Sequence, residues 1–319
     1  MGVKYFIAGG AGFIGSHVTK SLLKDPNTDL VTIYDNFSSG SEKNLGNFIN
    51  DKKIRIIKND ICELETLERA MQGHQVVYHF ASNPDIAKAV KEPDIDFWQG
   101  TYLTQNILEA MRRDSVLKII YASGSGVYGE TGEVPVYENM GSLNPISTYG
   151  ASKLAGEALI CAYAHMFNME ALAFRFANVV GPNQTHGVGY DFLRRLKQNP
   201  YELTILGDGT QSKSYIHIED IIFGINTARD KAKGCYNVFN LAAPNYLTVT
   251  EIAEMTFQIL NLQNVKLLFT GGDRGWKGDV PIVRFDTTSI RSLGWEPKRT
   301  TNEAMMDALL QMKKELETT

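Results

Sequence analysis

The sequence of 319 residues lacks the features that mark most specialised classes of protein. It has only three cysteines, far apart and without a C-x-x-C pair, which argues against a disulfide framework and against a thiolate metal site. No stretch approaches the roughly 20 apolar residues of a membrane-spanning helix. The net charge of −4 gives no support to nucleic-acid binding. Hydrophobic residues make up 43% and charged residues 21%, as in an ordinary globular protein.

The first residues also lack the charged, apolar and small-residue order of a signal peptide. Phe6 occupies the position that a myristoylation motif gives to Ser or Thr. Together with the few cysteines, these absences lead us to expect a cytoplasmic protein. The length is about twice that of an average domain of ~150 residues, so we expect two domains or one large α/β unit.

What the chain does have is an alternation of short apolar strands and helical segments. We expect strands over residues 3–8, 29–34, 54–58, 76–80, 117–122 and 170–176, and helices over 12–24, 63–71, 94–113 and 149–166. Several of the strands are apolar on both faces, which is typical of a parallel sheet covered by helices on either side. The alternation therefore predicts a doubly wound α/β fold.

The pattern changes after Asn178, where Gly, Pro and Asn separate shorter elements. We expect residues 1–176 to form the first domain, with part of 207–242 returning to it, and residues 177–319 to form a smaller α/β region. The helix predicted over 303–316 is amphipathic and is expected to close the fold.

The strongest local motif is a glycine-rich turn, Gly-Gly-Ala-Gly-Phe-Ile-Gly, between the first predicted strand and helix. Gly9 permits a tight turn, Gly12 allows a pyrophosphate to approach the backbone, and Gly15 permits close packing of helix and strand. Asp35 ends the second strand, where a carboxylate can accept hydrogen bonds from ribose hydroxyls and would repel a 2′-phosphate. This context predicts binding of a dinucleotide, and of NAD in preference to NADP.

A second motif places Tyr149 and Lys153 four residues apart, on one face of a predicted helix. A phenol with an ordinary pKa of about 10 is a poor base at neutral pH. A nearby ammonium favours the phenolate and brings the phenol toward a working pKa. A Y-x-x-x-K pattern alone is common on solvated helices, but it follows a dinucleotide turn here, which favours a catalytic pair.

These motifs belong to a larger set, which includes GGAGFIG, YDNFSSG, HFAS, VYGE, YGASK, FRFANVVGP, GDGTQSKSYIHIED and GWKGD. From Gly9 to about Asp279 the chain resembles the extended short-chain dehydrogenase/reductase superfamily, and within it the nucleotide-sugar epimerases and dehydratases. It looks most like compact UDP-galactose 4-epimerase-like proteins. The resemblance implies an NAD(P)-binding Rossmann fold with a smaller substrate-binding region.

The resemblance also implies roles for the matching positions. Those expected to hold NAD are Gly9, Gly12, Phe13, Ile14, Gly15, Asp35, Asn36, Ser38, Gly40, Asp60, Ile61, Phe80, Ala81, Ser82, Tyr149 and Lys153. Tyr149 would be the catalytic acid and base, with Lys153 as its partner. Those expected to contact a nucleoside-diphosphate sugar, most often UDP-linked, are Asn178, Val188, Leu206, Lys213 and Arg274.

The chain departs from the family at several of these places. Gly124 stands where a catalytic Ser or Thr is usual, so that Ser123, Ser125 or a water molecule would have to replace that hydroxyl, unless both serines only satisfy the loop backbone. Gln99 replaces an Asn near the cofactor. At the position expected to bind the diphosphate, Lys213 keeps the charge of the usual Arg but cannot form its bidentate hydrogen bonds. Trp276 stands where a second Arg is usual, and Arg274 could substitute for it.

The resemblance implies 4-epimerisation through a transient 4-keto sugar. No acid follows Gly124 until Glu130, which disfavours 4,6-dehydration, and Gly126 stands where the decarboxylating relatives carry a Glu. Two alternatives stay open: a 4-dehydrogenase or reductase that releases its cofactor, and a non-catalytic NAD-binding sensor. The six histidines show no recurrent metal spacing, so we expect no metal. Relatives pair through a four-helix seam, which predicts a homodimer.

Overall fold

Seven strands form the main sheet in the computed structural model, which describes residues 2–317. Their order across the sheet is β12 (Tyr236–Leu241), β7 (Glu170–Phe176), β5 (Lys118–Gly124), β4 (Val76–His79), β1 (Val3–Ala8), β2 (Thr28–Asp35) and β3 (Ile54–Lys58). The paired strands around β1 are parallel. The order runs outward from β1 in both directions, which confirms the predicted doubly wound α/β fold and puts the switch point between β1 and β4.

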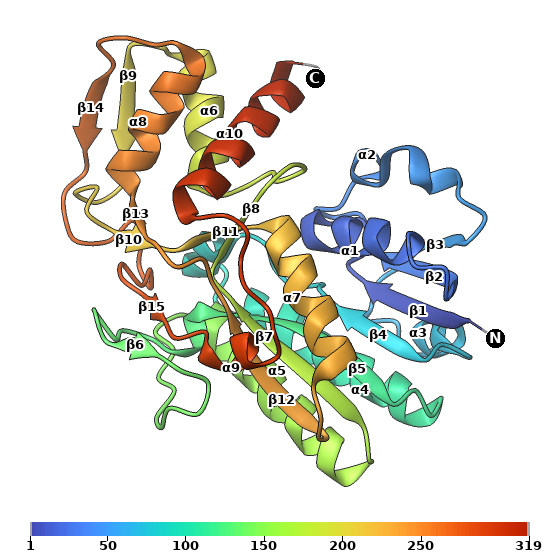
Figure 1. Cartoon of the computed structure of the whole chain (residues 1–319). Coiled ribbons are helices and arrows are strands. Elements are labelled where there is room, and N and C mark those ends of the chain that lie inside the picture. The colour runs from blue at the N-terminus through green and yellow to red at the C-terminus, as the bar shows by residue number, and fades with distance from the viewer. Residues whose placement is uncertain (1, 318–319) are drawn as a thin grey trace. The chain divides into compact units, whose positions relative to one another are not determined.

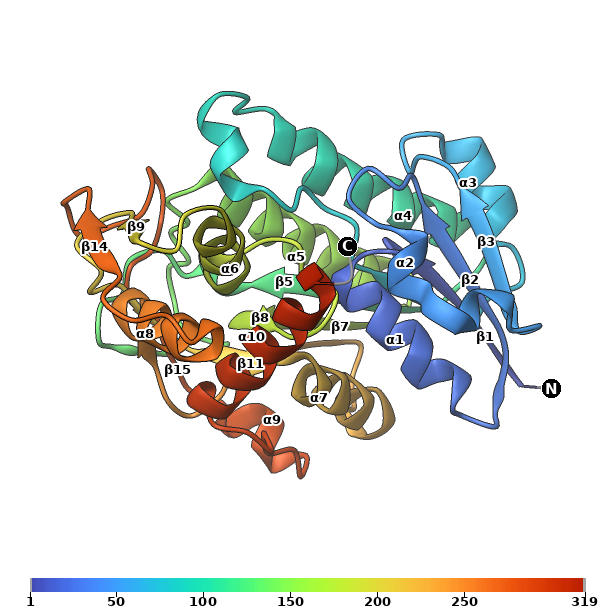
Figure 2. The same cartoon turned by 90° about the horizontal axis from the view of Figure 1, so that it is seen from above.

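The main sheet belongs to the first of two compact units, which consists of residues 2–124, 148–175 and 225–239. The strands are apolar on both faces because helices cover both. Helices α3 (Leu64–Met71), α4 (Leu103–Arg113) and α5 (Thr148–Met166) lie on one side and α1 (Phe13–Leu23) on the other (Figure 2). Phe6, Val77 and Ile119 pack against α3, α4 and α5 in one buried core, where each is fully buried.

Shorter elements complete this unit at the ends of the strands. They are α2 (Glu42–Leu45), the 3₁₀ turns η1 (Gly46–Asn50) and η2 (Ile86–Val90), and the π-helix η3 (Phe97–Tyr102). Helix α7 (Ile218–Lys231) begins in the second unit and ends in the first. The helix predicted over 94–113 is thus a π-helix followed by α4, because η3 packs closely on α5: a Cβ on Gly100 would lie 2.3 Å from the Ser152 hydroxyl.

The second unit consists of residues 125–147, 176–224 and 240–317. Its helices are α6 (Val188–Gln198), α8 (Val249–Leu260), α9 (Thr288–Ser292), α10 (Thr301–Glu317) and the short turn η4 (Ser125–Val127). Its strands pair two by two: β8 (Asn178–Val180) with β11 (Tyr215–His217), β9 (Glu202–Ile205) with β14 (Lys266–Phe269), β10 (Ser212–Lys213) with β13 (Leu247–Thr248), and β6 (Pro135–Val136) with β15 (Arg284–Phe285).

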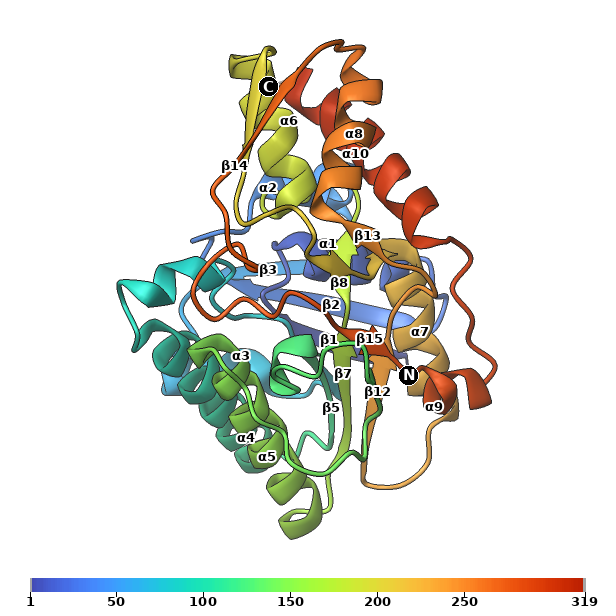
Figure 3. The same cartoon turned by 90° about the vertical axis from the view of Figure 1, so that its left-hand side faces the viewer.

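Three helices of this unit, α6, α8 and α10, lie side by side (Figures 1 and 3). They share one buried core that includes Phe192, Ile252 and Leu309. Within residues 2–317, no helix is long and apolar enough to cross a membrane.

Candidate active site

The glycine-rich turn joins β1 to α1 at the carboxyl edge of the main sheet. Gly9 has a positive φ of 80°, and a Cβ there would lie 2.7 Å from the Ala81 backbone nitrogen. A Cβ on Gly15 would lie 2.2 Å from the Gly9 carbonyl oxygen. Gly12 caps α1 with extended backbone and without a side-chain hydrogen bond to the cap. The turn therefore exposes helix N–H groups and leaves room for a phosphate, as a dinucleotide requires.

Asp35 is 8% exposed and holds this turn against the end of β2. One carboxylate oxygen accepts the Ala11 N–H at 2.9 Å, and the other accepts the Phe37 N–H at 2.8 Å. Each carboxylate oxygen has two lone pairs, so capacity for ribose hydroxyls is left. Both the glycine turn and Asp35 therefore fit NAD.

The next strands bring further predicted residues to the same edge. Asn36 donates a hydrogen bond of 2.9 Å to the Asp60 carboxylate after β3. Burial alone would raise the pKa of Asp60, but hydrogen bonds from Cys62 and Asn36 hold it below its usual value. The other predicted cofactor residues of this edge flank the ends of β2, β3 and β4: Ser38, Gly40, Ile61, Phe80, Ala81 and Ser82. Phe13 and Ile14 begin α1.

Tyr149 and Lys153 lie one turn apart on α5, beside β5. The Lys153 Nζ donates to the Ala122 carbonyl oxygen at 2.8 Å and lies 5.5 Å from the centre of the Tyr149 ring. Burial lowers the pKa of Lys153 to about 8, although Asp96 and Glu157 oppose that shift. Burial, with a contribution from the Asp96 carboxylate, raises the pKa of Tyr149 to about 12. The phenol of this structure is therefore protonated at neutral pH, and a further positive charge nearby would favour its ionisation.

The two candidate serines lie in different surroundings. Ser123, at the end of β5, is 4% exposed, and its hydroxyl donates to the Glu157 carboxylate at 2.5 Å. Ser125 begins η4 in the second unit and is half-buried. Between them, a Cβ on Gly124 would meet nothing within 4 Å.

In the second unit, most of the predicted substrate residues gather around β10. Lys213 donates to the buried Asp279 carboxylate at 2.6 Å, and its Nζ lies 5.3 Å from the Trp276 ring centre. Asn178 donates to the Ser214 carbonyl oxygen at 3.3 Å. Leu206 follows β9 and is 51% exposed. It lies near Gly275, because a Cβ added to Gly275 would be 3.8 Å from the Leu206 Cβ.

The remaining two predicted substrate residues are engaged elsewhere. Arg274 pairs with the Glu130 carboxylate at 2.7 Å and with Asp273 at 3.1 Å. Those two acids raise the pKa of the Arg274 guanidinium, so it is fully charged. Val188 begins α6 and packs at the margin of that helix's core, with no contact to the Lys213 cluster among the described interactions.

A model of the family described as "NAD dependent epimerase/dehydratase family" matches residues 5–242. The chain belongs to this family. Its cofactor is therefore NAD, and it is an NAD-dependent epimerase-type enzyme of the extended short-chain dehydrogenase/reductase superfamily, as the resemblance implied.

Individual family members match the chain over most of its length. An uncharacterised UDP-glucose epimerase of Bacillus subtilis is 32% identical and covers 79% of this chain and 81% of its own. The crystal structure of UDP-glucose 4-epimerase from Thermotoga maritima with UDP-glucose has a TM-score of 0.87 at 28% identity, and covers 98% of this chain and 100% of its own. A dTDP-glucose 4,6-dehydratase of Streptomyces venezuelae shares the fold, with a TM-score of 0.91 at 23% identity over 99% of this chain and 98% of its own.

Several residues around the Tyr149–Lys153 pair were not predicted from the sequence. Glu157, Arg175 and Asp96 are each at most 3% exposed. Arg175 forms an ion pair with Glu157 at 2.7 Å, and Asp96 accepts a hydrogen bond of 2.7 Å from Thr148. Two signals were available. Glu157 comes eight residues after Tyr149, hence on the same helix face, and Arg175 interrupts the apolar run that follows Glu170 in β7.

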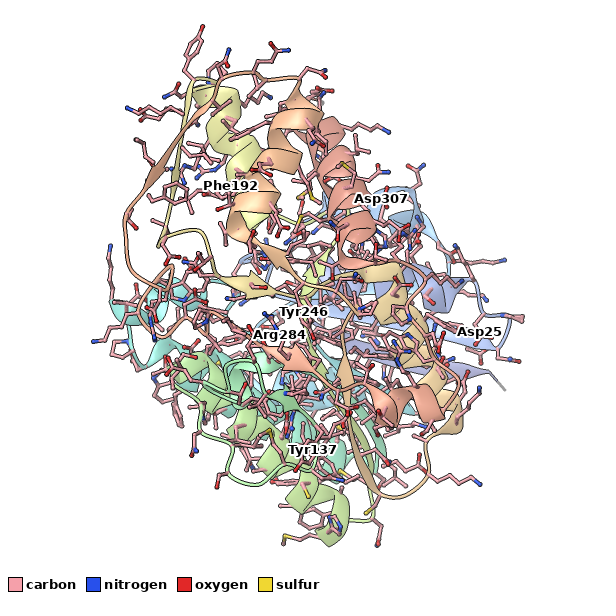
Figure 4. The ribbon with its side chains drawn as sticks, turned by 60° about the vertical axis from the view of Figure 1, so that its left-hand side comes forward. Asp25, Tyr137, Phe192, Tyr246, Arg284 and Asp307 are labelled. Carbon is pink, nitrogen blue, oxygen red and sulfur yellow. The ribbon has the colours of Figure 1, made fainter. Side chains whose placement is uncertain are left out.

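Arg284 was missed in the second unit. Its guanidinium lies 4.0 Å from the centre of the Tyr246 ring and donates to the Ser212 carbonyl oxygen at 3.0 Å, next to Lys213 (Figure 4). An ion pair with the Glu133 carboxylate at 2.6 Å, stacking on an aromatic ring and a bond to the strand backbone fix this cation in place. The sequence offered no signal for it, because the residues that hold it are more than 30 positions away.

Proposed function

We propose that the protein is a UDP-sugar 4-epimerase of the UDP-glucose/galactose type. The observation that carries the proposal is the Tyr149–Lys153 pair, with Lys153 buried and Tyr149 half-buried, on a helix that packs against the same sheet as a glycine turn suited to NAD. The first unit would hold the cofactor, and the second would hold the nucleotide sugar.

In this proposal Tyr149 is the only group that moves a proton to and from the sugar. Bound NAD supplies a hydride acceptor, and later a donor, at the sugar C4. As the phenolate, which a bound cationic cofactor would favour, the Tyr149 oxygen would take the proton of the C4 hydroxyl as that carbon is oxidised, and would give it back when C4 is reduced on its other face. The Lys153 ammonium stabilises the phenolate in between.

The residues around β10 suit a UDP group as well. Lys213, Asn178 and Leu206 would hold the diphosphate and the base, with Arg274 and Val188 at the substrate-specifying loops. Because Lys213 and Arg274 already pair with carboxylates, a bound diphosphate would compete with those acids for the two cations. Glu130, the first acid after Gly124, is itself paired with Arg274, which further disfavours a dehydratase reaction that needs a free carboxylate.

The decisive experiment incubates the purified protein with UDP-glucose, UDP-galactose and their N-acetyl and uronate counterparts, without added NAD. We expect inversion at C4, followed by NMR, with no net accumulation of NADH. Stoichiometric NADH would instead identify a 4-dehydrogenase. Tight NAD binding without turnover of any UDP-, GDP- or CDP-sugar would identify a sensor and overturn the proposal.

Replacing Lys213 with Gln is expected to weaken binding of UDP about ten- to hundredfold. The substitution removes one charge-assisted hydrogen bond to the diphosphate, and such bonds contribute about 1.5–3 kcal/mol. Titration calorimetry with UDP measures the effect. Lys266→Gln, an exposed lysine on β14, is the matched control and should bind UDP like the wild type. Equal affinity in both variants would remove Lys213 from the substrate site.

We also propose that the protein is a cytoplasmic homodimer whose copies pair through α4 and α5. In support, Phe97 and Trp98, which lead into α4, are each 50% exposed, and Met166 at the end of α5 is 70% exposed. Apolar side chains exposed on adjacent helices favour association. Sedimentation equilibrium tests this: a dimer that Trp98→Glu converts to monomer is expected, and a monomeric wild type would contradict it.

A further inference from the structure

Two successive residues of β5 are anchored to two successive turns of α5. The carbonyl oxygen of Ala122 accepts the Lys153 ammonium at 2.8 Å, and the hydroxyl of Ser123 donates to Glu157 at 2.5 Å. Lys153 and Glu157 lie four residues apart and face the same way as Tyr149. The end of β5 is therefore fixed in register against the helix face that carries the catalytic pair.

Glu157 is itself held from the other side by Arg175 on β7. The Arg175 Nε donates to one carboxylate oxygen at 3.0 Å and Nη2 to the other at 2.7 Å, a bidentate arrangement. Ser123, Glu157 and Arg175 are all at most 4% exposed. Removal of one member of such a buried ion pair leaves an uncompensated charge, so loss of this contact is costly and the three side chains are held together.

This arrangement restricts what Ser123 can do. A serine has a single O–H donor, and that of Ser123 is directed to an ionised carboxylate, the strongest acceptor in its surroundings. The same hydroxyl cannot also donate to a sugar oxygen. Ser125 is half-buried, and no hydrogen bond of its side chain is among those described for residues 2–317.

We propose that Ser123, Glu157 and Arg175 form a positioning network for the Tyr149–Lys153 pair, and that Ser123 does not donate to the substrate. The proposal rests on the proposed function, since it assigns roles in that reaction. The network holds the Ala122 carbonyl where it orients the Lys153 ammonium toward Tyr149. Ser123 and Glu157 thus act through Lys153, and the hydroxyl that replaces the family's Ser or Thr is that of Ser125 or of water.

A double-mutant cycle tests this assignment in the NAD-loaded enzyme. Ser123→Ala is expected to lower kcat ten- to hundredfold with KM nearly unchanged, the size of effect that a small misplacement of a catalytic group produces. Ser123→Thr, which keeps the hydroxyl, should restore kcat. In the Glu157→Gln background, Ser123→Ala should lower kcat much less, because the Gln amide oxygen accepts the Ser123 hydroxyl more weakly than the ion-paired carboxylate does.

Ser125→Ala is the comparison variant for the cycle. Its effect on kcat should multiply with that of Glu157→Gln, because Ser125 is not part of the network. If Ser123→Ala instead lowered kcat by the same factor in both backgrounds, Ser123 would act on the substrate directly and the proposal would be wrong.

A second readout does not depend on turnover. Ultraviolet titration of the NAD-loaded protein, with Tyr149→Phe as the blank, follows the ionisation of Tyr149. Ser123→Ala changes no formal charge, and the charged and titratable groups that face Lys153 stay the same: His79 on β4, Tyr121 on β5, Asp96 before η3, and Tyr149 and Glu157 on α5. A shift therefore reports a change in position.

We expect Tyr149 to ionise at a higher pH in Ser123→Ala than in the wild type, because a displaced Lys153 stabilises the phenolate less. Ser123→Thr should titrate like the wild type. A shifted titration in a protein that turns over no UDP-sugar would overturn the proposed function and keep the network. An unshifted titration of Ser123→Ala in a protein that is an active epimerase would overturn the positioning network and keep the proposed function.

Discussion

Replacing Tyr149 with Phe is expected to lower epimerase turnover by about 10²–10⁴-fold while NAD stays bound, the range typical of losing a general acid–base group. Phe preserves the ring beside Lys153, whose ammonium lies 5.5 Å from its centre, so packing is kept. What is lost is the oxygen that takes the C4 hydroxyl proton in the proposed reaction.

The effect is measured as kcat with UDP-galactose, alongside the NAD content of the purified variant. Tyr121→Phe is the matched control, because the Tyr121 ring also lies near the Lys153 ammonium, at 5.2 Å. It should cost less than about tenfold, since Tyr121 is fully buried in β5 and has no role in the proposed proton transfer. Turnover of Tyr149→Phe within a few-fold of the wild type would exclude Tyr149 from the chemistry.

The architecture of the first unit could be predicted because its signals are local. Strands expected over 3–8, 54–58 and 170–176 match β1, β3 and β7 residue for residue. Fully buried strands read as continuous apolar runs, and glycines and polar residues end them. The doubly wound class followed from the alternation with helices, whereas the order of the strands came from the structure.

The π-helix η3 is a feature of the first unit that local sequence signals could not predict. Residues 97–102 have helical spacing, and nothing in it indicates a wider turn. The wider turn accompanies the close approach of η3 to α5 at Gly100 and Ser152, two residues that are 52 positions apart. Contacts of this kind are settled by tertiary packing and leave no mark on periodicity.

The same division applies to the candidate site. Tyr149, Lys153 and the glycine turn are motifs within a few residues, so spacing was enough to single them out. The choice between Ser123 and Ser125 was open because both stand in one short polar stretch. It depends on Glu157, which lies 34 positions from Ser123 in sequence.

In the second unit, even less of the candidate site could be predicted from the sequence. Lys213 was predicted to carry charge to a diphosphate, but its buried partner Asp279 is 66 positions away. Arg284 and Tyr246 come together from segments that no sequence spacing connects. A loop-rich region with small two-stranded pairings offers few periodic signals, so the arrangement of its charges was visible only in three dimensions.

Replacing Gly15 with Ala is expected to abolish NAD binding and to destabilise the fold by about 1–3 kcal/mol or more, the usual cost of overpacking. A Cβ at this position would lie 2.2 Å from the Gly9 carbonyl oxygen and 2.8 Å from the Gly10 Cα, so the turn must open. Calorimetric titration with NAD and chemical denaturation measure the two effects.

Two further glycines separate the causes of that loss. A Cβ on Gly12 would lie 3.3 Å from the Gly9 carbonyl oxygen, a contact that a small shift relieves, so Gly12→Ala should fold nearly normally yet bind NAD poorly where the pyrophosphate approaches. Gly141→Ala, in open space, should match the wild type in both measurements. If Gly15→Ala kept the affinity of the wild type for NAD, the turn would not be the cofactor cradle. If Gly12→Ala also kept the affinity of the wild type for NAD, the expectation that a phosphate of NAD closely approaches Gly12 would be wrong. That result would not depend on whether Gly15 is needed for folding.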